Sequence, residues 1–189
     1  MKRRITPFAL PLLLFGCATY SLVEAKRTPI GDLYTVDPQI SWSSASQGKI
    51  ELWTVDGPSL QAIRFVKGLE DGEYLFKGKE EEKAPKFNKR MTPSEIVEFV
   101  VDNLTAVGAQ NVKAVNLRPE KFGNHQGFRF ELTFASKEGL EEEGFVVGVV
   151  VKEHLYLIMY TGVKAHYYRK HKEHVERILE SISMKSGAS

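Results

Sequence analysis

The chain has 189 residues, 42% of them hydrophobic and 26% charged, which fits one ordinary globular domain with a sizeable core. Residues 1–16 hold Lys2, Arg3, Arg4 and no acid, so the remaining 23 basic and 24 acidic residues nearly balance. Nucleic-acid-binding proteins normally carry a basic excess, so we expect no nucleic-acid partner. A single cysteine excludes a disulfide framework and a zinc-finger spacing.

The N-terminus has the organisation of an export signal. The basic residues precede an apolar run, Ile5 to Phe15, which is too short to span a bilayer and suits a signal-peptide core. The run ends in Leu14-Phe15-Gly16-Cys17, which contains the only cysteine. This stretch resembles the lipobox of bacterial lipoproteins, with leucine three residues before the cysteine and a small residue directly before it. Phe15 departs from that pattern, which usually has a smaller residue there.

The resemblance implies that residues 1–16 are a signal peptide and that the thiol of Cys17 receives a diacylglyceryl group before cleavage. A triacylated cysteine is a stable membrane anchor. Ala18, in place of Asp, implies the outer membrane, with the domain facing the periplasm. Two alternatives stay open: cleavage after the small-x-small sequence Val23-Glu24-Ala25, and a Cys17 that is only an apolar residue of the signal core.

The first half of the mature chain predicts strands. We expect residues 17–29 to be a lipidated tether, residues 30–184 the globular domain and residues 185–189 a tail. Strands are expected over 31–36, 40–44, 49–55 and 60–66, the last two pairing as a hairpin across Asp56-Gly57-Pro58. The charged stretch 70–90, rich in Gly and Pro, is expected to be a solvated loop.

A helix is predicted to start at Thr92-Pro93-Ser94-Glu95, where Thr92 caps, Pro93 takes the first helical position and Glu95 completes a capping box. It should end at Gly108. Strands follow over 112–117, 126–135, 145–151 and 155–160, with turns at 119–124, 137–144 and 153–154. The last three strands should form an antiparallel meander. A final helix is expected over 166–182.

This order resembles the α/β/α sandwich shared by the photosystem protein PsbP, a nuclear-import factor that binds the GTPase Ran, and bacterial lipoproteins of the same layout. The resemblance lies in Gly127–Thr133, Gly144–Gly148, Leu155–Thr161, Tyr167-Tyr168 and Val175–Ile182. It implies an α+β fold: a largely antiparallel sheet of about six to seven strands flanked by helices. In that superfamily the fold mostly serves docking and assembly.

Few residues suggest a catalytic, metal-binding or ligand-binding role. His171 and His174 are weak metal candidates, because their spacing of three is poorer than i, i+4 and Arg169, Lys170 and Lys172 would repel a cation. Trp42 and Trp53 could stack a ligand or pack in the sheet. There is no Gly-x-Ser-x-Gly elbow and no glycine-rich phosphate loop, and we expect no cofactor. The stretch 164–172 is basic and aromatic, and either lies near anionic lipid headgroups or is a solvated helix face.

The sequence therefore predicts a lipid-anchored, non-enzymatic cell-envelope protein that docks a protein partner or supports envelope assembly. The alternative is a periplasmic module that binds a small molecule or ion in a pocket between the sheet and the 70–90 loop. An enzyme is the third possibility. A flat apolar patch would favour docking, and a concave pocket with convergent polar groups would favour ligand binding.

Overall fold

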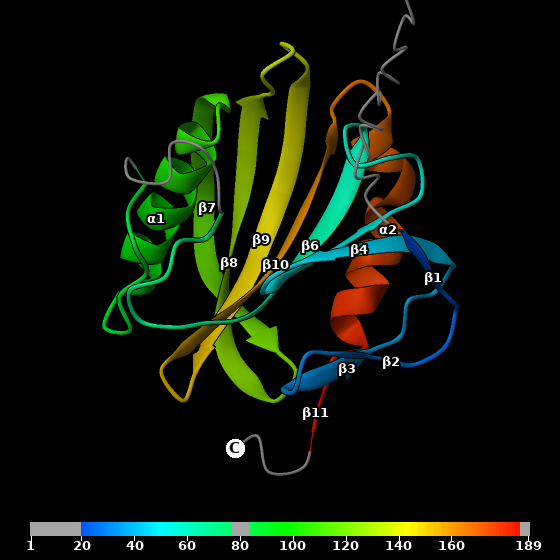
Figure 1. Ribbon diagram of the computed structural model, residues 1–189, viewed down its shortest axis with the longest axis horizontal. Coiled ribbons are helices and arrows are strands. Elements are labelled where there is room, and N and C mark those ends of the chain that lie inside the picture. The colour runs from blue at the N-terminus through cyan, green and yellow to red at the C-terminus, as the bar shows by residue number, and fades with distance from the viewer. Residues whose placement is uncertain (1–19, 77–83, 186–189) are drawn as a thin grey trace, which may run out of the picture.

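The computed structural model describes residues 20–76 and 84–185, which form two sheets and two helices (Figure 1). In chain order the elements are β1 (Ser21–Val23), β2 (Thr28–Ile30), β3 (Tyr34–Val36), β4 (Trp42–Gln47), β5 (Ile50–Thr54), β6 (Gln61–Leu69), α1 (Pro93–Ala106), β7 (Gln110–Phe122), β8 (His125–Ala135), β9 (Glu141–Val151), β10 (His154–Val163), α2 (Tyr167–Glu180) and β11 (Ser183–Met184). The main sheet has the order β1-β4-β5-β6-β10-β9-β8-β7, and the small sheet the order β11-β3-β2. All the pairings are antiparallel.

The expected sandwich of six to seven strands between helices is wrong. The main sheet has eight strands, the small sheet has three, and the described residues contain only two helices. The strands that the sequence did not predict are short: β1, β2 and β11 have two or three residues each, too few to show an alternating pattern. Strands therefore dominate the fold.

The two helices lie on opposite faces of the main sheet. One core cluster joins α2, through Val175 and Ile178, to residues such as Phe65 and Tyr160 of the sheet and to the small sheet. The other joins α1, through Phe99 and other residues, to the opposite sheet face. The strands in the middle are apolar on both sides because each of their faces meets one of these clusters.

The meander and the hairpin follow the prediction. The strands β8, β9 and β10 are consecutive neighbours, and β5 pairs with β6. The alternation in β8 puts Phe128, Phe130 and Leu132 together in the core on the α1 side. A bidentate ion pair ties the other face of β8 to α2: Arg129 donates to both oxygens of Glu176, at 2.6 and 2.8 Å.

The first helix begins as the sequence predicts. The hydroxyl of Thr92 accepts from the backbone N–H of Glu95, and the Glu95 carboxylate accepts from the backbone N–H of Thr92. Near its other end, the buried amide of Asn103 donates to the carbonyl of Pro85 and accepts from the N–H of Leu75. Asn103 therefore connects α1 to both described parts of the 70–90 segment, residues 70–76 and residues 84–90.

Three boundaries differ from the expectation. The stretch 17–29, expected to be a tether, contains β1 and the first two residues of β2. The turn expected at 119–124 is mostly strand, because β7 continues through Pro119, which pairs with Phe128. An edge strand tolerates proline, since its outward side needs no ladder donor. The turn expected at 137–144 is shorter because β9 begins at Glu141.

No helix of the described residues is long and apolar enough to cross a bilayer.

Candidate functional site

An apolar groove lies where the N-terminal end of α1 passes over β7, β8 and β9. Its volume is about 540 Å³, within the range of small-molecule and side-chain binding sites. It is lined by Met91, Pro93, Ile96, Leu117, Arg118, Pro119, Gln126, Gly127, Phe128, Val149 and Val150. Most of these side chains are apolar, so the groove is built to cover an apolar group.

The floor of the groove depends on two glycines. A Cβ on Gly148 would lie 2.6 Å from Cζ of Phe128 and 2.5 Å from Cδ2 of Leu157, so the bare glycine makes room for the Phe128 ring. A Cβ on Gly127 would collide with the backbone oxygen of Gly148. The two glycines therefore allow β8 and β9 to approach closely, and Phe128 belongs to the core cluster between the sheet and α1.

The wall on the helix side is set by the capping box. Thr92 and Glu95 fix where the helix starts, which places Pro93 and Ile96 in its first turn over the sheet. Met91 precedes the cap and its N–H donates to the carbonyl of Asn88. The sequence feature that predicted the helix start therefore also positions this wall.

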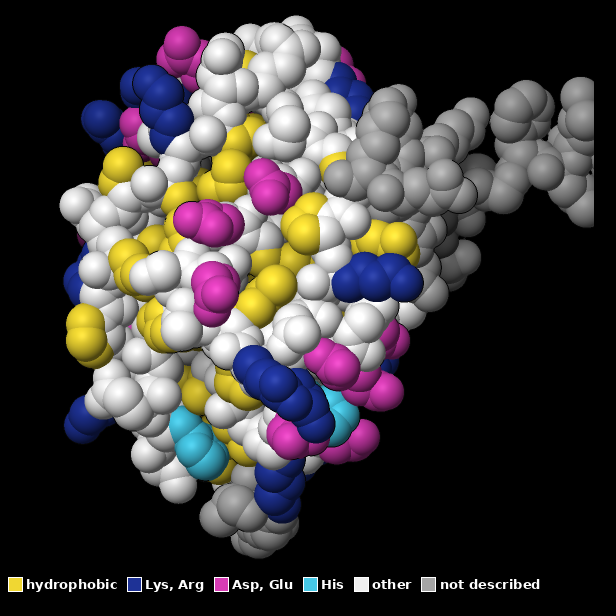
Figure 2. All heavy atoms as spheres, turned by 90° about the vertical axis from the view of Figure 1, so that its left-hand side faces the viewer, with side chains coloured by type: hydrophobic (Ala, Val, Ile, Leu, Met, Phe, Trp, Pro, Cys, Tyr) yellow, Lys and Arg dark blue, Asp and Glu magenta, His cyan; other side chains and the backbone are white. Residues whose placement is uncertain are grey.

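The rim on the sheet side is exposed. Leu117 is 40% and Val150 36% exposed, and Val115, farther along β7, is 52% exposed. In Figure 2, which faces the α1 and β7 side of the molecule, apolar side chains form a broken band among charged ones. Because β7 is the last strand of the sheet, its outer backbone N–H and C=O groups have no strand partner in the described chain.

Arg118 is the only charged residue in the lining of the groove. Its guanidinium donates to Glu131 at 3.3 Å and to the carbonyl of Asn116. The amide of Asn116 also donates to Glu131, and this hydrogen bond, with the charge of Arg118, lowers the pKa of that carboxyl. Acid–base chemistry needs a side chain that gains or loses a proton inside the groove, and Arg118 stays protonated. The lining therefore suits binding.

The residues predicted to carry the anchor, Leu14, Phe15, Gly16 and Cys17, lie outside the described residues. The first described residue, Tyr20, directly precedes β1 at the edge of the main sheet opposite β7.

The two tryptophans are structural. Trp42 and Trp53 are both fully buried, with ring centroids 6.4 Å apart. The indole N–H of Trp42 donates to the carbonyl of Pro38, and that of Trp53 to the carboxylate of Glu51. Of the two roles that the sequence left open for these rings, the burial supports packing in the sheet.

The two candidate histidines, His171 and His174, have different partners in the structure. Nε2 of the buried His171 lies 2.7 Å from Oδ2 of Asp56, whereas His174 contacts Arg177. Lys170 donates to the other oxygen of Asp56, and these two hydrogen bonds hold the pKa of the Asp56 carboxyl below its usual value. Among the residues that the structure describes, no group of three His, Cys, Asp or Glu side chains could hold a metal ion.

A hollow does lie between the sheet and the 70–90 segment. It has a volume of about 390 Å³ and includes Tyr74 and Phe76 on one side and Lys49 and Ile50 on the other. The ammonium of Lys49 is already paired with Glu70 and Glu73. The hollow lies where the alternative prediction from the sequence placed a ligand pocket, between the sheet and the 70–90 loop.

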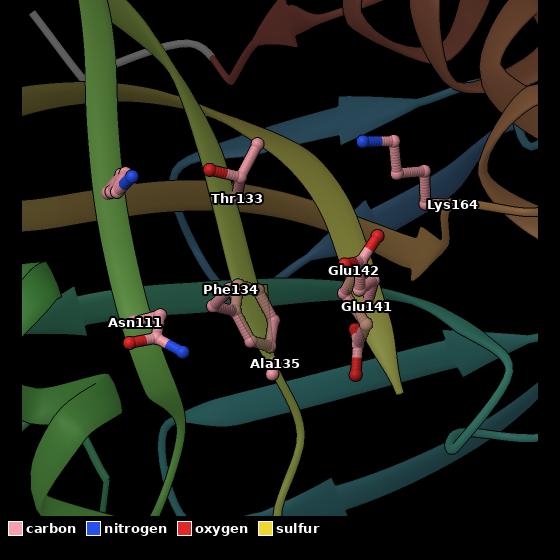
Figure 3. Close-up of a pocket in the computed structure, with 8 residues that line it drawn as sticks. Asn111, Thr133, Phe134, Ala135, Glu141, Glu142 and Lys164 are labelled. Carbon is pink, nitrogen blue, oxygen red and sulfur yellow. The ribbon is translucent and has the colours of Figure 1, made fainter. Parts of the chain in front are cut away.

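A smaller polar pocket of about 240 Å³ lies at the end of β7, β8 and β9 (Figure 3). Its lysines come from β7 and the loop after β10 and its glutamates from β9, and Figure 3 shows Asn111 and Lys164 on opposite sides of the pocket. Burial raises the pKa of Glu142, and the charge of Arg64 and a hydrogen bond from Thr161 oppose that rise. The pocket thus contains side chains of both charge signs.

Sequence reasoning missed the groove. Predicting a strand end at Leu117 and a turn from Pro119 separated residues that in fact lie on one long edge strand. The available signal was the alternation of Val115, Leu117 and Pro119, whose continuation past the proline is possible only at a sheet edge.

No family model and no curated protein matches this chain. Among solved structures, the chain is similar to LpqN, a protein involved in cell envelope biogenesis of Mycobacterium tuberculosis, with 7% identity and a TM-score of 0.40 over 91% of this chain and 87% of that one. Similarity at this level assigns neither a fold family nor a function to the chain.

Proposed function

We propose that the protein is a lipid-anchored cell-envelope protein that docks a partner protein through the apolar groove, and that it is not an enzyme. The observation that carries the proposal is the placement of the groove and of β1, the first described strand, at opposite edges of the main sheet. The chain enters the domain at β1, and the groove lies beside β7, seven strands away.

The anchor is supported by Leu14, Gly16 and Cys17 in the sequence and by the position of β1. Cleavage after Ala25 would remove β1, in which Ser21, Leu22 and Val23 pair with β4. Cleavage before Cys17 keeps the whole strand. Processing at Cys17 is therefore the cut that leaves the described domain intact.

The geometry favours a soluble partner in the groove. Ser21 comes four residues after Cys17, a reach of at most about 14 Å. Seven strand spacings separate β1 from β7, up to about 34 Å along the sheet. The lipid of this chain therefore holds the β1 edge at the membrane and leaves the groove facing away from it.

The occupant we propose is an extended segment of a partner protein carrying apolar side chains. The groove offers a site for such side chains, and the adjacent β7 edge offers backbone hydrogen bonds. A free small molecule would use the groove alone and would gain nothing from the open strand edge.

Site-specific photo-crosslinking in intact cells tests the docking. A crosslinking amino acid at Leu117 should give one discrete adduct, identified by mass spectrometry, which a second substitution, Val150→Glu, should abolish. The matched control is Leu140, which is equally exposed at 40% but lies in the β8–β9 hairpin, outside the groove lining. Equal labelling from Leu117 and Leu140, or an adduct insensitive to Val150→Glu, would rule out docking at the groove.

The second candidate function is binding of a small molecule in the hollow between β5 and the 70–76 segment, which the aromatic rings of Tyr74 and Phe76 favour. In that case Tyr74→Ala would reduce retention of a small molecule that copurifies with the protein, and Leu117→Glu would not. The docking proposal predicts instead that Tyr74→Ala leaves the adduct formed from position 117 unchanged.

A further inference from the structure

A cavity of about 400 Å³ lies on the α2 side of the main sheet, on the face opposite the groove. It is bounded by the β7–β8 hairpin, by β9 and by the C-terminal end of α2. Figure 1 shows the turn between β7 and β8 at the same end of the molecule as that end of α2. The two meet there, because a Cβ on Gly123 in the turn would lie 3.2 Å from Cγ2 of Ile182. The volume is within the range of small-molecule sites.

One wall of this cavity is apolar. It consists of Val147 from β9, Leu179 from α2 and Ile182 directly after α2. All three pack in the core cluster on the α2 side of the sheet, and Leu179 is the most accessible of them. Such a wall favours a ligand with an alkyl side chain, because contact removes apolar surface of both from water.

Two carboxylates at the cavity have no ion-pair partner among the residues that the structure describes. Glu120 accepts a hydrogen bond from the backbone N–H of Lys121 at 3.1 Å, and Glu180 has no hydrogen bond in the described chain. The ammonium of Lys121 does not neutralise them. Alternation along β7 puts Glu120 and the core residue Phe122 on the α2 side and the Lys121 side chain on the other.

Glu180 is placed unfavourably for the helix that carries it. The carbonyl end of a helix has a partial negative charge, which disfavours an acid there. Glu180 also follows Glu176 by four residues, a spacing at which like charges destabilise a helix. Of the nearby cations in α2, Arg177 lies against His174, and Lys172 is about 12 Å away along the helix axis. A cation bound in the cavity would offset both unfavourable effects.

A buried donor lines the same cavity. Arg129 is 8% exposed, and its Nη1 and Nη2 donate to the two oxygens of Glu176. Its Nε, in contrast, is buried and has no hydrogen-bond partner among the described residues. The guanidinium also lies over the ring of Phe145, 4.0 Å from its centroid, which holds it in place. A buried N–H without an acceptor costs stability, so this atom calls for an acceptor oxygen on a ligand.

We propose that this cavity binds an α-amino group together with its neighbouring carbonyl oxygen and an apolar side chain. The ammonium lies between Glu120 and Glu180, the carbonyl oxygen accepts from Nε of Arg129, and the side chain covers Leu179. An amino-acid amide and the N-terminus of a polypeptide share this chemistry. The cavity is a second site, separate from the groove, because the two lie on opposite faces of the main sheet.

Isothermal titration calorimetry of the purified native protein tests the ligand chemistry with three probes. Leucinamide has the ammonium, the carbonyl and the apolar side chain, whereas isopentylamine lacks the carbonyl and N-acetyl-leucinamide lacks the charge. At about pH 6.5, where an α-amino group is protonated, leucinamide should bind at least tenfold more tightly than either analogue. No binding of leucinamide, or equal affinity for all three probes, would overturn the proposal.

Substitutions locate the bound probe. Glu180→Gln and Glu120→Gln should each weaken the binding of leucinamide at least fivefold, and circular dichroism checks the fold. The matched control is Glu173→Gln, an exposed glutamate of α2 outside the cavity lining, which should have no effect. Leu117→Glu should also have no effect, because it changes only the groove. Binding that is insensitive to both Glu180→Gln and Glu120→Gln would overturn the site without touching the docking proposal.

A fourth probe distinguishes the two sources of the ligand chemistry. The peptide Leu-Gly-Gly amide has the same ammonium, carbonyl and side chain as leucinamide and continues as a chain. Binding as tight as that of leucinamide supports the N-terminus of a polypeptide as the ligand. Binding of leucinamide alone supports a free amino-acid derivative.

Discussion

Val23 lies opposite Trp42 in the antiparallel pairing of β1 with β4, and it packs against the core cluster that contains Trp42. Trp42 is fully buried, and its indole N–H donates to the carbonyl of Pro38 at 2.9 Å. The strand β1 is therefore part of the folded domain, and cleavage after Ala25 would remove it.

The role of β1 predicts different effects at neighbouring residues. Val23→Asp should lower the free energy of unfolding by about 1–3 kcal/mol, because it places a charge against the core. Leu22→Asp should change it by less than about 0.5 kcal/mol, because Leu22 is 69% exposed. Urea unfolding of the two variants measures the difference, and equal effects would mean that β1 does not cover the core.

This edge shows what the sequence could and could not predict. Long elements with a clear period, such as β8 and α1, were predictable because several residues repeat the pattern. The strand β1 was not, because three residues carry no period and its only partner, β4, is remote in the chain. Short strands form when a neighbouring strand supplies the hydrogen bonds, which is tertiary information.

Asp56 should make stability depend on pH. Its carboxylate accepts from Lys170 and His171, and its pKa lies below the ordinary value of 3.8. A depressed pKa in the folded state means that the unfolded chain takes up the proton first as pH falls. The contribution of Asp56 is therefore complete well above pH 3.8 and is lost as pH falls through the lower folded-state pKa.

The wild type should lose more free energy of unfolding than Asp56→Asn between about pH 5 and about pH 3. Urea unfolding at both pH values checks this, with Asp102→Asn, an exposed aspartate of α1, as the matched control. If Asp56→Asn and the wild type show the same pH dependence, the pairing with α2 contributes nothing to stability.

Asn103 should hold the 70–76 segment against α1. In Asn103→Ala, the buried N–H of Leu75 and the carbonyl of Pro85 lose their partner, which should cost about 1–3 kcal/mol and expose the segment to limited proteolysis. Thr105→Ala, in the same helix, removes only an exposed hydroxyl that bonds the carbonyl of Val101 and should be near neutral. Unchanged proteolysis in Asn103→Ala would show that the segment is held by other contacts.

The floor of the groove should respond differently to its two glycines. Gly148→Ala presses on the ends of the Phe128 and Leu157 side chains, which can shift, so a cost of about 1–3 kcal/mol is expected. Gly127→Ala collides with a backbone oxygen, which cannot give way, so its loss of stability should be larger. Thermal unfolding ranks the two variants, and the reverse order would contradict the close approach of β8 to β9.

Only one side of the groove could be predicted from the sequence with its surroundings unknown. The wall formed by α1 was predictable, because the capping box at Thr92 and Glu95 indicates where α1 starts. The side formed by β7 was not predictable, because Pro119 indicates a turn unless the strand is known to lie at a sheet edge. The edge position of β7 depends on the order of all eight strands.

The intact mass of the native protein and the identity of its first residue test the anchor, on which the account rests, most directly. We expect a mature chain that begins at an acylated Cys17, and a Cys17→Ser variant that is neither acylated nor processed there. A mature chain that begins at Lys26, without lipid and without β1, would contradict it.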